Sequence, residues 1–378
     1  MTLSRRIFLV AALSAFVTSA QAQDLTSKLD YVLTGYEKNR AFIGSALVAK
    51  GGKTILEKGY GMANIELGVP NGPDTKFRLG SITKQFTATA ILQLEEQGKL
   101  SVNDLACKYV AECPESWKAI TIHQLLTHTS GIPSYTNGPE FTKPRMMRIP
   151  LSPMEVLTLT KDKPLEFQPG EKFKYDNSGY VFLGVIIEKV SGEKYADYLK
   201  KHIFGPLDMQ DSGYDDTSAI LKNRAAGYRS SDNGEFHNAE YLDMSLPYSA
   251  GSLYSTVRDL ARWDRALYTG KVLSKASREK MWTPVKNNYG YGWDVRKDGH
   301  KQLSHGGGIN GFSTFIARYP DDDAVVIVLS NNQQANTAPI AIALAGVLFG
   351  EGADLPWERK QISVAQNILD RYAGAAKY

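Results

Sequence analysis

The sequence is poor in cysteine, with only two in 378 residues, and poor in metal-binding patterns. It contains neither Cys-x-x-Cys nor His-Glu-x-x-His, so we expect no metal site and no cofactor. Cys107 and Cys113 lie in a loop-like stretch, and in an oxidising compartment we expect them to pair. The loop that they would close is short, so any stabilisation would be local. His123 and His128 flank Gln-Leu-Leu-Thr, and we interpret both as structural residues.

No charge of one sign dominates the chain. The 44 Lys and Arg residues against 40 Asp and Glu give a formal net charge of +4. Residues 1–22 carry Arg5 and Arg6 and no acidic residue, so without them the net charge is +4 − 2 = +2. This small excess gives no basis for nucleic-acid binding or for attachment to a membrane surface. Charged residues at 22% and apolar residues at 43% are typical of a folded chain with a large core.

The apolar run at the N-terminus is too short to span a bilayer. It follows Arg5-Arg6, extends to Val17 and precedes Ala20-Gln21-Ala22, a small-x-small cleavage pattern. The sequence therefore predicts a signal peptide over residues 1–22, cleaved near Ala22. The paired arginines resemble a bacterial twin-arginine export signal, with an ordinary secretory signal as the alternative. We expect a periplasmic or secreted protein without a lipid anchor, since no cysteine lies near the cleavage site.

Strand-like patterns occur at both ends of the chain and helical patterns in the middle. We expect a sheet part over about 23–80 and 285–350, with a mainly helical insertion over about 81–284. Residues 351–378 form a tail that is either a natural end or the start of a further domain. The segments with these patterns are helices Leu25–Asn39 and Pro339–Phe349, a hairpin of Ile43–Ala49 and Thr54–Gly59 around Gly51-Gly52, and strands Tyr289–Val295, Phe312–Tyr319 and Ala324–Ser330.

Ser81 and Lys84 form a Ser-x-x-Lys pair at the start of an apolar helix that Gly98 ends. Residues i and i+3 share a helix face, so the hydroxyl and the amine can touch. The field of the first helical turn, with desolvation, lowers the pKa of the lysine and lets a neutral amine take the serine proton. The alternative is an N-cap serine beside a solvated lysine. The same spacing occurs at Ser191/Lys194 and Ser277/Lys280, where it looks like a helix cap and a polar surface helix.

Acyl transfer through a serine also needs a proton donor for the leaving group and donors for an oxyanion. Tyr175-Asp176-Asn177 supplies a phenol and an amide after a Pro-Gly turn, and Tyr135-Thr136-Asn137 repeats the pattern. For either pair the alternative is that these residues only stabilise a turn. His305-Gly306-Gly307-Gly308 precedes a strand, so a substrate could lie along a side-chain-free edge with the Gly308 N–H aimed at an oxyanion.

Two other interpretations of the glycine run fail on their context. Gly306-x-Gly308-x-x-Gly311 matches a dinucleotide-binding pattern, but that pattern requires a following helix and a strand pattern follows. His-Gly-Gly-Gly resembles a lipase oxyanion motif, but the chain contains no Gly-x-Ser-x-Gly.

Three motifs in chain order, Ser81/Lys84, Tyr175/Asn177 and His305/Gly307, resemble those of the serine β-lactamase and penicillin-binding superfamily. The closer resemblance is to its class C-like branch, with D-alanyl-D-alanine carboxypeptidases, D-aminopeptidases and β-lactamase-fold esterases. It covers roughly residues 25–350 and implies an α/β (α+β) fold with an antiparallel sheet flanked by N- and C-terminal helices. Supporting stretches are Leu125–Gly131, Phe167–Gly170, Ser249–Ser252 and His305–Phe312.

The resemblance implies a role for each motif residue. Ser81 would be the nucleophile, Lys84 its base and Tyr175 the proton relay to the leaving group. Substrate contacts would come from Asn177, His305 and Gly307, and the backbone amides of Ser81 and Gly308 would hold the oxyanion.

The third motif departs from the Lys-Thr-Gly of many β-lactamases, because His305-Gly306-Gly307 lacks a fixed positive charge for a substrate carboxylate.

From the three motifs and the export signal together, we expect an exported serine hydrolase that forms an acyl-enzyme with small amides or esters, in particular D-amino-acid peptides. The alternatives are an esterase or weak β-lactamase of this fold, and a non-catalytic protein that binds peptidoglycan or peptides.

Overall fold

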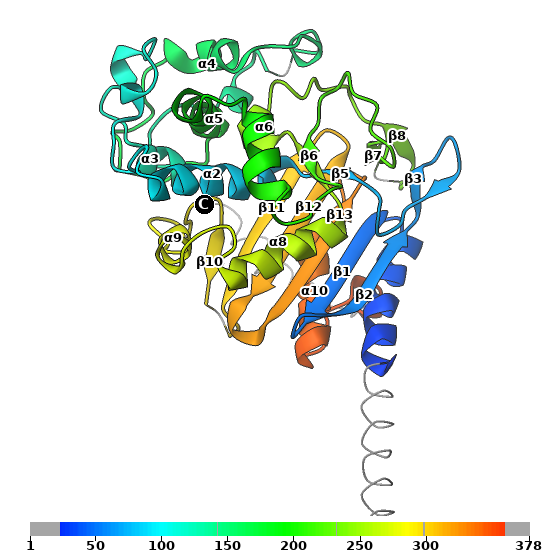
Figure 1. The fold of residues 1–378 in the computed structure, drawn as a ribbon. Coiled ribbons are helices and arrows are strands. Elements are labelled where there is room, and N and C mark those ends of the chain that lie inside the picture. The colour runs from blue at the N-terminus through cyan, green and yellow to red at the C-terminus, as the bar shows by residue number, and fades with distance from the viewer. Residues whose placement is uncertain (1–22, 142, 232, 298, 360–378) are drawn as a thin grey trace, which may run out of the picture.

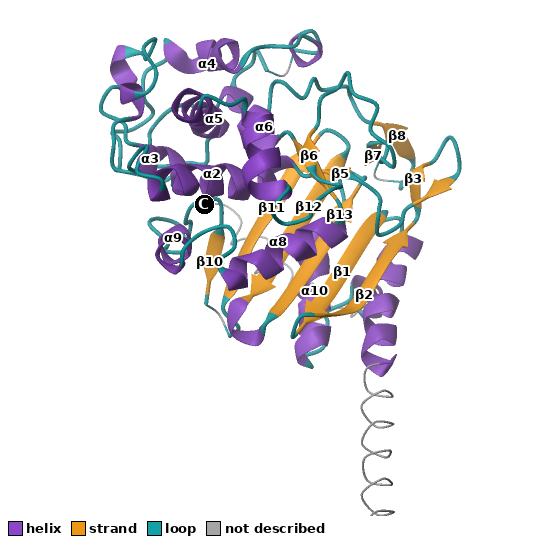
Figure 2. Ribbon diagram, viewed as in Figure 1, coloured by secondary structure: helices purple, strands orange, loops and turns teal. Residues whose placement is uncertain are grey.

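The computed structural model describes residues 23–359 except residues 142, 232 and 298. Its centre is an antiparallel six-stranded sheet in the order β10-β11-β12-β13-β1-β2 (Figures 1 and 2). The predicted antiparallel sheet, assembled from both ends of the chain, is confirmed. The strands are β1 (Gly44–Lys50), β2 (Lys53–Tyr60), β10 (Asp294–Arg296), β11 (Gln302–Ile309), β12 (Phe312–Tyr319) and β13 (Ala324–Ser330).

The first and last strands of the sheet pair at its centre. β1 lies antiparallel to β13, with Gly44 opposite Ser330 and Lys50 opposite Ala324. All seven residues of β13 are buried, as expected for a strand covered on both faces. The tight turn between β1 and β2 uses Gly51 and Gly52, both at positive φ, which confirms the predicted hairpin.

Helices cover both faces of the sheet. The helix of residues 23–38 and α10 (Thr337–Phe349) pack on one face, where Leu29, Val48 and Leu344 share one apolar cluster. α8 (Val257–Thr269) lies on the other face, in front of the sheet in Figure 1. Its Trp263 belongs to a second cluster that continues into the helical region. The predicted flanking by N- and C-terminal helices is confirmed.

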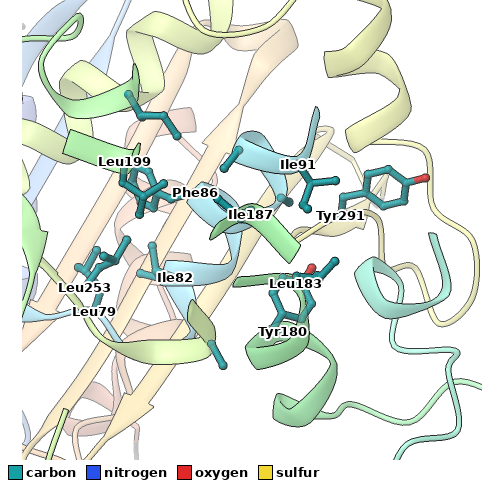
Figure 3. Packing of buried hydrophobic residues seen from close by; sticks show 14 of the residues in the cluster. Leu79, Ile82, Phe86, Ile91, Tyr180, Leu183, Ile187, Leu199, Leu253 and Tyr291 are labelled. Atoms are coloured by element: carbon teal, nitrogen blue, oxygen red, sulfur yellow. The ribbon is translucent and has the colours of Figure 1, made fainter. Parts of the chain in front are cut away.

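The helical region lies at one end of the sheet, with α2 (Thr83–Glu96) and α5 (Asn177–Ser191) at its centre. Figure 3 shows Phe86 and Ile91 of α2 beside Leu183 and Ile187 of α5 in the same apolar cluster. A helix that is apolar on most sides is stable only when it is buried, so these two helices form a rigid base for the residues at their N-termini. The other helices with α-geometry are α3 (Ile122–Leu126), α4 (Pro153–Lys161), α6 (Tyr195–Leu199), α7 (Tyr248–Gly251) and α9 (Lys275–Met281).

Smaller strands connect the two parts. Three short strands pair as β5-β9-β6, and two hairpins form β3-β4 and β7-β8. Their bounds are β3 (Met62–Asn64), β4 (Val69–Pro70), β5 (Phe77–Arg78), β6 (Gly213–Tyr214), β7 (Tyr228–Ser230), β8 (Phe236–Asn238) and β9 (Leu253–Ser255). β5 leads directly into a 3₁₀ turn, η1 (Gly80–Ile82), which precedes α2.

The strand predicted over Tyr289–Val295 is mostly absent. Only Asp294–Arg296 pairs with β11, and the preceding residues form turns with Asn287, Asn288 and Gly292 at positive φ. The alternating aromatic residues of this segment are buried in the core, as a strand's would be, but they belong to a loop packed on α2. Burial therefore produced the alternation, and the backbone did not need to be extended.

Cys107 and Cys113 form a disulfide, as expected. Within residues 23–359, apart from the three gaps, no helix combines the length and the apolar character needed to cross a bilayer. The predicted signal peptide and the part of the tail beyond residue 359 lie outside the described residues.

Candidate active site

Ser81 lies in the 3₁₀ turn η1, against strand β11. The preceding Gly80 has a φ of +54°, and a Cβ added there would come within 2.9 Å of the Gly308 nitrogen and 3.0 Å of its oxygen. Only glycine allows this backbone conformation and this close approach at low cost. The chain is thus shaped to bring the backbone of Ser81 next to that of Gly308.

Lys84 lies in the first turn of α2 and is fully buried. Its Nζ lies 3.1 Å from Ser81 Oγ, 2.8 Å from Asn177 Oδ1 and 2.8 Å from the Ala250 carbonyl oxygen. The carbonyl and the amide oxygen can only accept, so a neutral amine would donate both its N–H groups to them. Its lone pair then faces Ser81 Oγ and can accept the hydroxyl proton.

Burial lowers the pKa of Lys84 to about 7, from 10.5 for an exposed lysine, although the nearby Asp176 carboxylate opposes this shift. Within the described chain no carboxylate lies within ion-pair distance of its Nζ. The amine is therefore substantially neutral at physiological pH, which is the state a general base requires.

Tyr175 lies beside this pair. Lys84 Nζ is 4.8 Å from the centre of its ring. The Tyr175 hydroxyl is buried and, among the described residues, has no hydrogen-bond partner. Burial raises the pKa of Tyr175, and the neighbouring Ser81 hydroxyl opposes the shift, so the phenol stays protonated at neutral pH.

Asn177 begins helix α5, and the side chain of Asp176 caps this helix by accepting a hydrogen bond from the Gly179 N–H. The Asn177 amide accepts from Lys84 and donates from Nδ2 to Thr136 Oγ1 at 3.1 Å. Thr136 belongs to the second Tyr-x-Asn stretch, so the two stretches meet. Tyr135, however, donates its hydroxyl to the Leu246 carbonyl oxygen. Of these two tyrosines, Tyr175 is the one beside Lys84 whose hydroxyl has no hydrogen-bond partner among the described residues.

The other two Ser-x-x-Lys pairs do not form such a group. Lys194 pairs with Glu188, and Lys280 pairs with Glu95 on the surface.

His305 is buried behind the pocket. Its Nδ1 lies 2.6 Å from the Gly306 carbonyl oxygen, so Nδ1 carries the proton and donates it, and Nε2 accepts from the Tyr289 hydroxyl at 2.9 Å. Burial lowers the pKa of His305 to about 3. The ring is thus neutral, and it supports the wall of the site without adding charge to it.

Gly307 and Gly308 fulfil different steric needs. A Cβ on Gly307 would come within 1.9 Å of the Leu79 carbonyl oxygen, whereas one on Gly308 would meet no atom within 4 Å.

β10 pairs with β11 only at Gln302, Leu303 and Ser304. Beyond them, the edge of β11 opposite β12 is without a strand partner in the described chain, so an extended substrate can pair with it.

A pocket of about 250 Å³ opens at Ser81. Its walls carry no charged side chain, and neither His305 nor Tyr175 is among them. The residues around it are Gly80, Ser81, Tyr135, Thr136, Phe141, Asn177, Leu242, Pro247, Ala250, Gly251, Gly308, Ile309 and Asn310. In the part of the chain that the structure describes, no group of three or more His, Cys, Asp or Glu residues could hold a metal ion.

The structure thus brings Ser81, Lys84, Tyr175, Asn177 and Gly308 together, with His305 and Gly307 directly behind. Sequence reasoning missed Thr136 and Ala250. Thr136 lies in the second Tyr-x-Asn stretch, which the sequence analysis noted without giving Thr136 a role. Ala250 contributes a carbonyl oxygen, which every residue has, so no side-chain pattern could have revealed it.

Comparisons with protein families, with known sequences and with solved structures all point to the same family. The Beta-lactamase family matches residues 29–348. Penicillin-binding protein 4* of Bacillus subtilis is 33% identical over 362 residues, covering 88% of this chain and 79% of its own. The crystal structure of a penicillin-binding protein from Bacillus halodurans superposes with a TM-score of 0.75 and 30% identity, over 85% of this chain and 99% of that one. A D-stereospecific amidohydrolase from Streptomyces sp. gives a TM-score of 0.69 and 27% identity, over 82% and 96% of the two chains. The predicted resemblance is confirmed, and this chain belongs to the beta-lactamase family.

Proposed function

We propose that this protein is a serine hydrolase that forms a covalent acyl-enzyme on Ser81 with small amides or esters. The observation that carries the proposal is the set of contacts around Lys84. A buried amine with two fixed acceptors and one hydroxyl within 3.1 Å is arranged to remove a proton from that hydroxyl.

In the proposed reaction, Ser81 Oγ attacks the substrate carbonyl carbon as its proton passes to Lys84 Nζ. The carbonyl oxygen becomes an oxyanion held by the backbone N–H groups of Ser81 and Gly308. Collapse of this intermediate breaks the bond to the leaving group, which receives a proton from the Tyr175 hydroxyl, and Lys84 returns the proton to Tyr175. A water molecule then attacks the ester carbon by the reverse route and frees Ser81.

D-amino-acid peptides or amides are the proposed natural substrates. The similarity to a D-stereospecific amidohydrolase and to penicillin-binding proteins supports this class. The free edge of β11 supports it too, because an extended backbone can pair there.

The uncharged pocket favours a second candidate, an esterase or an amidase for neutral substrates. The walls offer aromatic and aliphatic contacts from Tyr135, Phe141 and Leu242 and no cation for a carboxylate. A substrate with a free C-terminal carboxylate would leave that charge without a partner in the pocket, at a cost in affinity. We propose export from residues 1–22 as well, on their signal-peptide pattern alone.

The mature protein should be incubated with a fluorophosphonate and with a labelled penicillin, and then weighed. We expect a covalent adduct on Ser81 that Ser81→Ala abolishes while Ser277→Ala, the matched Ser-x-x-Lys control, retains it. Folded wild-type protein without an adduct would instead favour a non-catalytic binder. Rates with p-nitrophenyl acetate, nitrocefin and D-alanyl-D-alanine, the last with and without an amidated C-terminus, then separate esterase, lactamase and peptidase.

A further inference from the structure

We infer that His128 is a positioning residue for Tyr175, an inference that rests on the proposed function. The sequence predicts only a structural histidine here. The structure, however, places His128 in contact with Tyr175 and with both of its neighbours in the chain.

His128 accepts hydrogen bonds from the residues on both sides of Tyr175. The carbonyl oxygen of His128 accepts from the Lys174 N–H at 3.0 Å, and its Nδ1 accepts from the Asp176 N–H at 3.2 Å. These two partners are the residues immediately before and after Tyr175. His128 therefore fixes the backbone from which the phenol projects.

The imidazole also packs on the phenol itself. The centres of the His128 and Tyr175 rings are 4.2 Å apart, closer than the 6.3 Å that separates Tyr175 from Tyr289 or from His305. Because the Tyr175 hydroxyl has no hydrogen-bond partner in the described chain, its position depends on the packing of its ring. Of the rings in contact with it, that of His128 is the nearest.

The backbone at His128 is unusual in a way that fits this role. Its φ is +55°, in the left-handed region that few residues other than Gly, Asn, Asp and His enter. The side chain is fully buried. Since Nδ1 accepts a hydrogen bond, the ring is neutral with its proton on Nε2. A residue at this position must therefore tolerate the left-handed conformation, offer an acceptor to Asp176 and present a flat face to Tyr175.

The test compares His128→Gly with His128→Asn. Glycine keeps the backbone conformation but loses the ring and the acceptor. Asparagine also tolerates positive φ and can accept from the Asp176 N–H. We expect His128→Gly to lower kcat by about 10-fold or more with KM within about 2-fold, because small misplacements of a reacting group are costly. His128→Asn should recover part of this loss. His123→Gln, at a half-buried histidine that contacts Tyr291, is the matched control with unchanged kcat.

A double-mutant cycle separates action through Tyr175 from general loss of structure. In a Tyr175→Phe background, His128→Gly should lower kcat by no more than about 2-fold. An equal loss in both backgrounds, an unchanged kcat in folded His128→Gly, or an asparagine variant no better than the glycine variant would each overturn the inference. A fully active Tyr175→Phe would instead contradict the proposed function. Rates are normalised to the folded fraction measured by circular dichroism.

Discussion

At the scale of single residues, the proposed activity depends on the protonation state of one amine, that of Lys84. Lys84 is buried with three oxygen neighbours and, among the described residues, no ion-pair partner, so its charged form is disfavoured. The sequence predicted that Ser81 and Lys84 touch at a helix start and that desolvation, with the field of the first turn, lowers the pKa of the lysine. The degree of burial, which moves the pKa, depends on helix α7 and on residues far away in the chain.

The pH dependence of catalysis follows from this amine. Below pH 7, Lys84 takes up a proton and can no longer accept one from Ser81. For an uncharged ester, kcat/KM should fall by about 10-fold per unit of pH below that value. His305 should not contribute, because its pKa lies near 3. A pH–rate profile between 5 and 9 checks this, and a flat profile would rule out Lys84 as the base.

The same amine should make folding dependent on pH. Its pKa is near 7 in the folded chain and 10.5 when exposed, so the unfolded chain binds more protons between these values. Stability relative to Lys84→Met should therefore rise with pH in this window, by about 1 kcal/mol per unit, and should stay constant below it. Urea unfolding of both proteins at pH 6, 7.5 and 9 measures this difference. If the difference in the free energy of unfolding between the two proteins is the same at all three pH values, the lowered pKa of Lys84 is contradicted.

The two tyrosines of the site give a third prediction. Tyr175→Phe should lower kcat by about 10²-fold or more, because it removes the proposed proton relay. Tyr135→Phe removes a hydrogen bond to the Leu246 carbonyl oxygen, so it should lower the melting temperature and change kcat much less than Tyr175→Phe does. Steady-state kinetics and thermal melts of the two variants decide between them. The reverse order of effects on kcat would make Tyr135 the relay.

At the scale of elements, the site is the contact between η1 and β11. These elements can lie close together because Gly80 and Gly307 have no side chains. The glycine run was visible in the sequence as a stretch that precedes the strand Phe312–Tyr319. Its place inside a strand of its own, β11, was not predicted. The resemblance singled out Gly307, but its steric reason could not be predicted, because it depends on the Leu79 carbonyl oxygen, which lies against Gly307 and against neither Gly306 nor Gly308.

Adjacent alanine substitutions test this contact. A Cβ at Gly307 would overlap the Leu79 carbonyl oxygen at 1.9 Å, whereas one at Gly306 would make an ordinary contact at 3.5 Å with Phe315. Gly307→Ala should push β11 away from Ser81 and reduce kcat/KM by about 10²-fold, while Gly306→Ala should change it by less than about 3-fold. Kinetics with one ester substrate suffice. Equal effects would show that the separation of the two elements is not critical.

At the scale of the whole molecule, the sheet unites the two ends of the chain. The apolar patterns predicted strands at both ends of the chain and the two terminal helices, and the resemblance to the superfamily implied that the strands form an antiparallel sheet. Strand β11 was not predicted, because its three glycines interrupt any apolar pattern. The segment 289–293 was misjudged as strand, because buried aromatic side chains alternate there along a loop. The residues that line the pocket could not be predicted either, because Phe141, Leu242 and Ile309 come together only in the folded chain.

Truncation tests how far the sheet is a single unit. A chain of residues 23–322 lacks β13, which lies between β12 and β1 with all its residues buried. We expect it not to unfold cooperatively, because β12 and β1 lose the strand between them, one face of the sheet loses α10, and α8 on the other face loses its contacts with β13. A chain of residues 23–359, which keeps β13 and α10, is the control and should unfold cooperatively. Circular dichroism melts compare them, and a cooperative transition in the shorter chain would show that the remaining strands form a stable domain.

The pairing of β1 with β13 also sets an order of events during synthesis. Ser81 leaves the ribosome early, but Gly308 and β13, the strand that joins β12 to β1, follow more than 200 residues later. Until then the proposed nucleophile has its lysine on the same turn but no second donor for the oxyanion. If Ser81 is the nucleophile, we expect it to stay unreactive during synthesis until the sheet closes and brings Gly308 next to it.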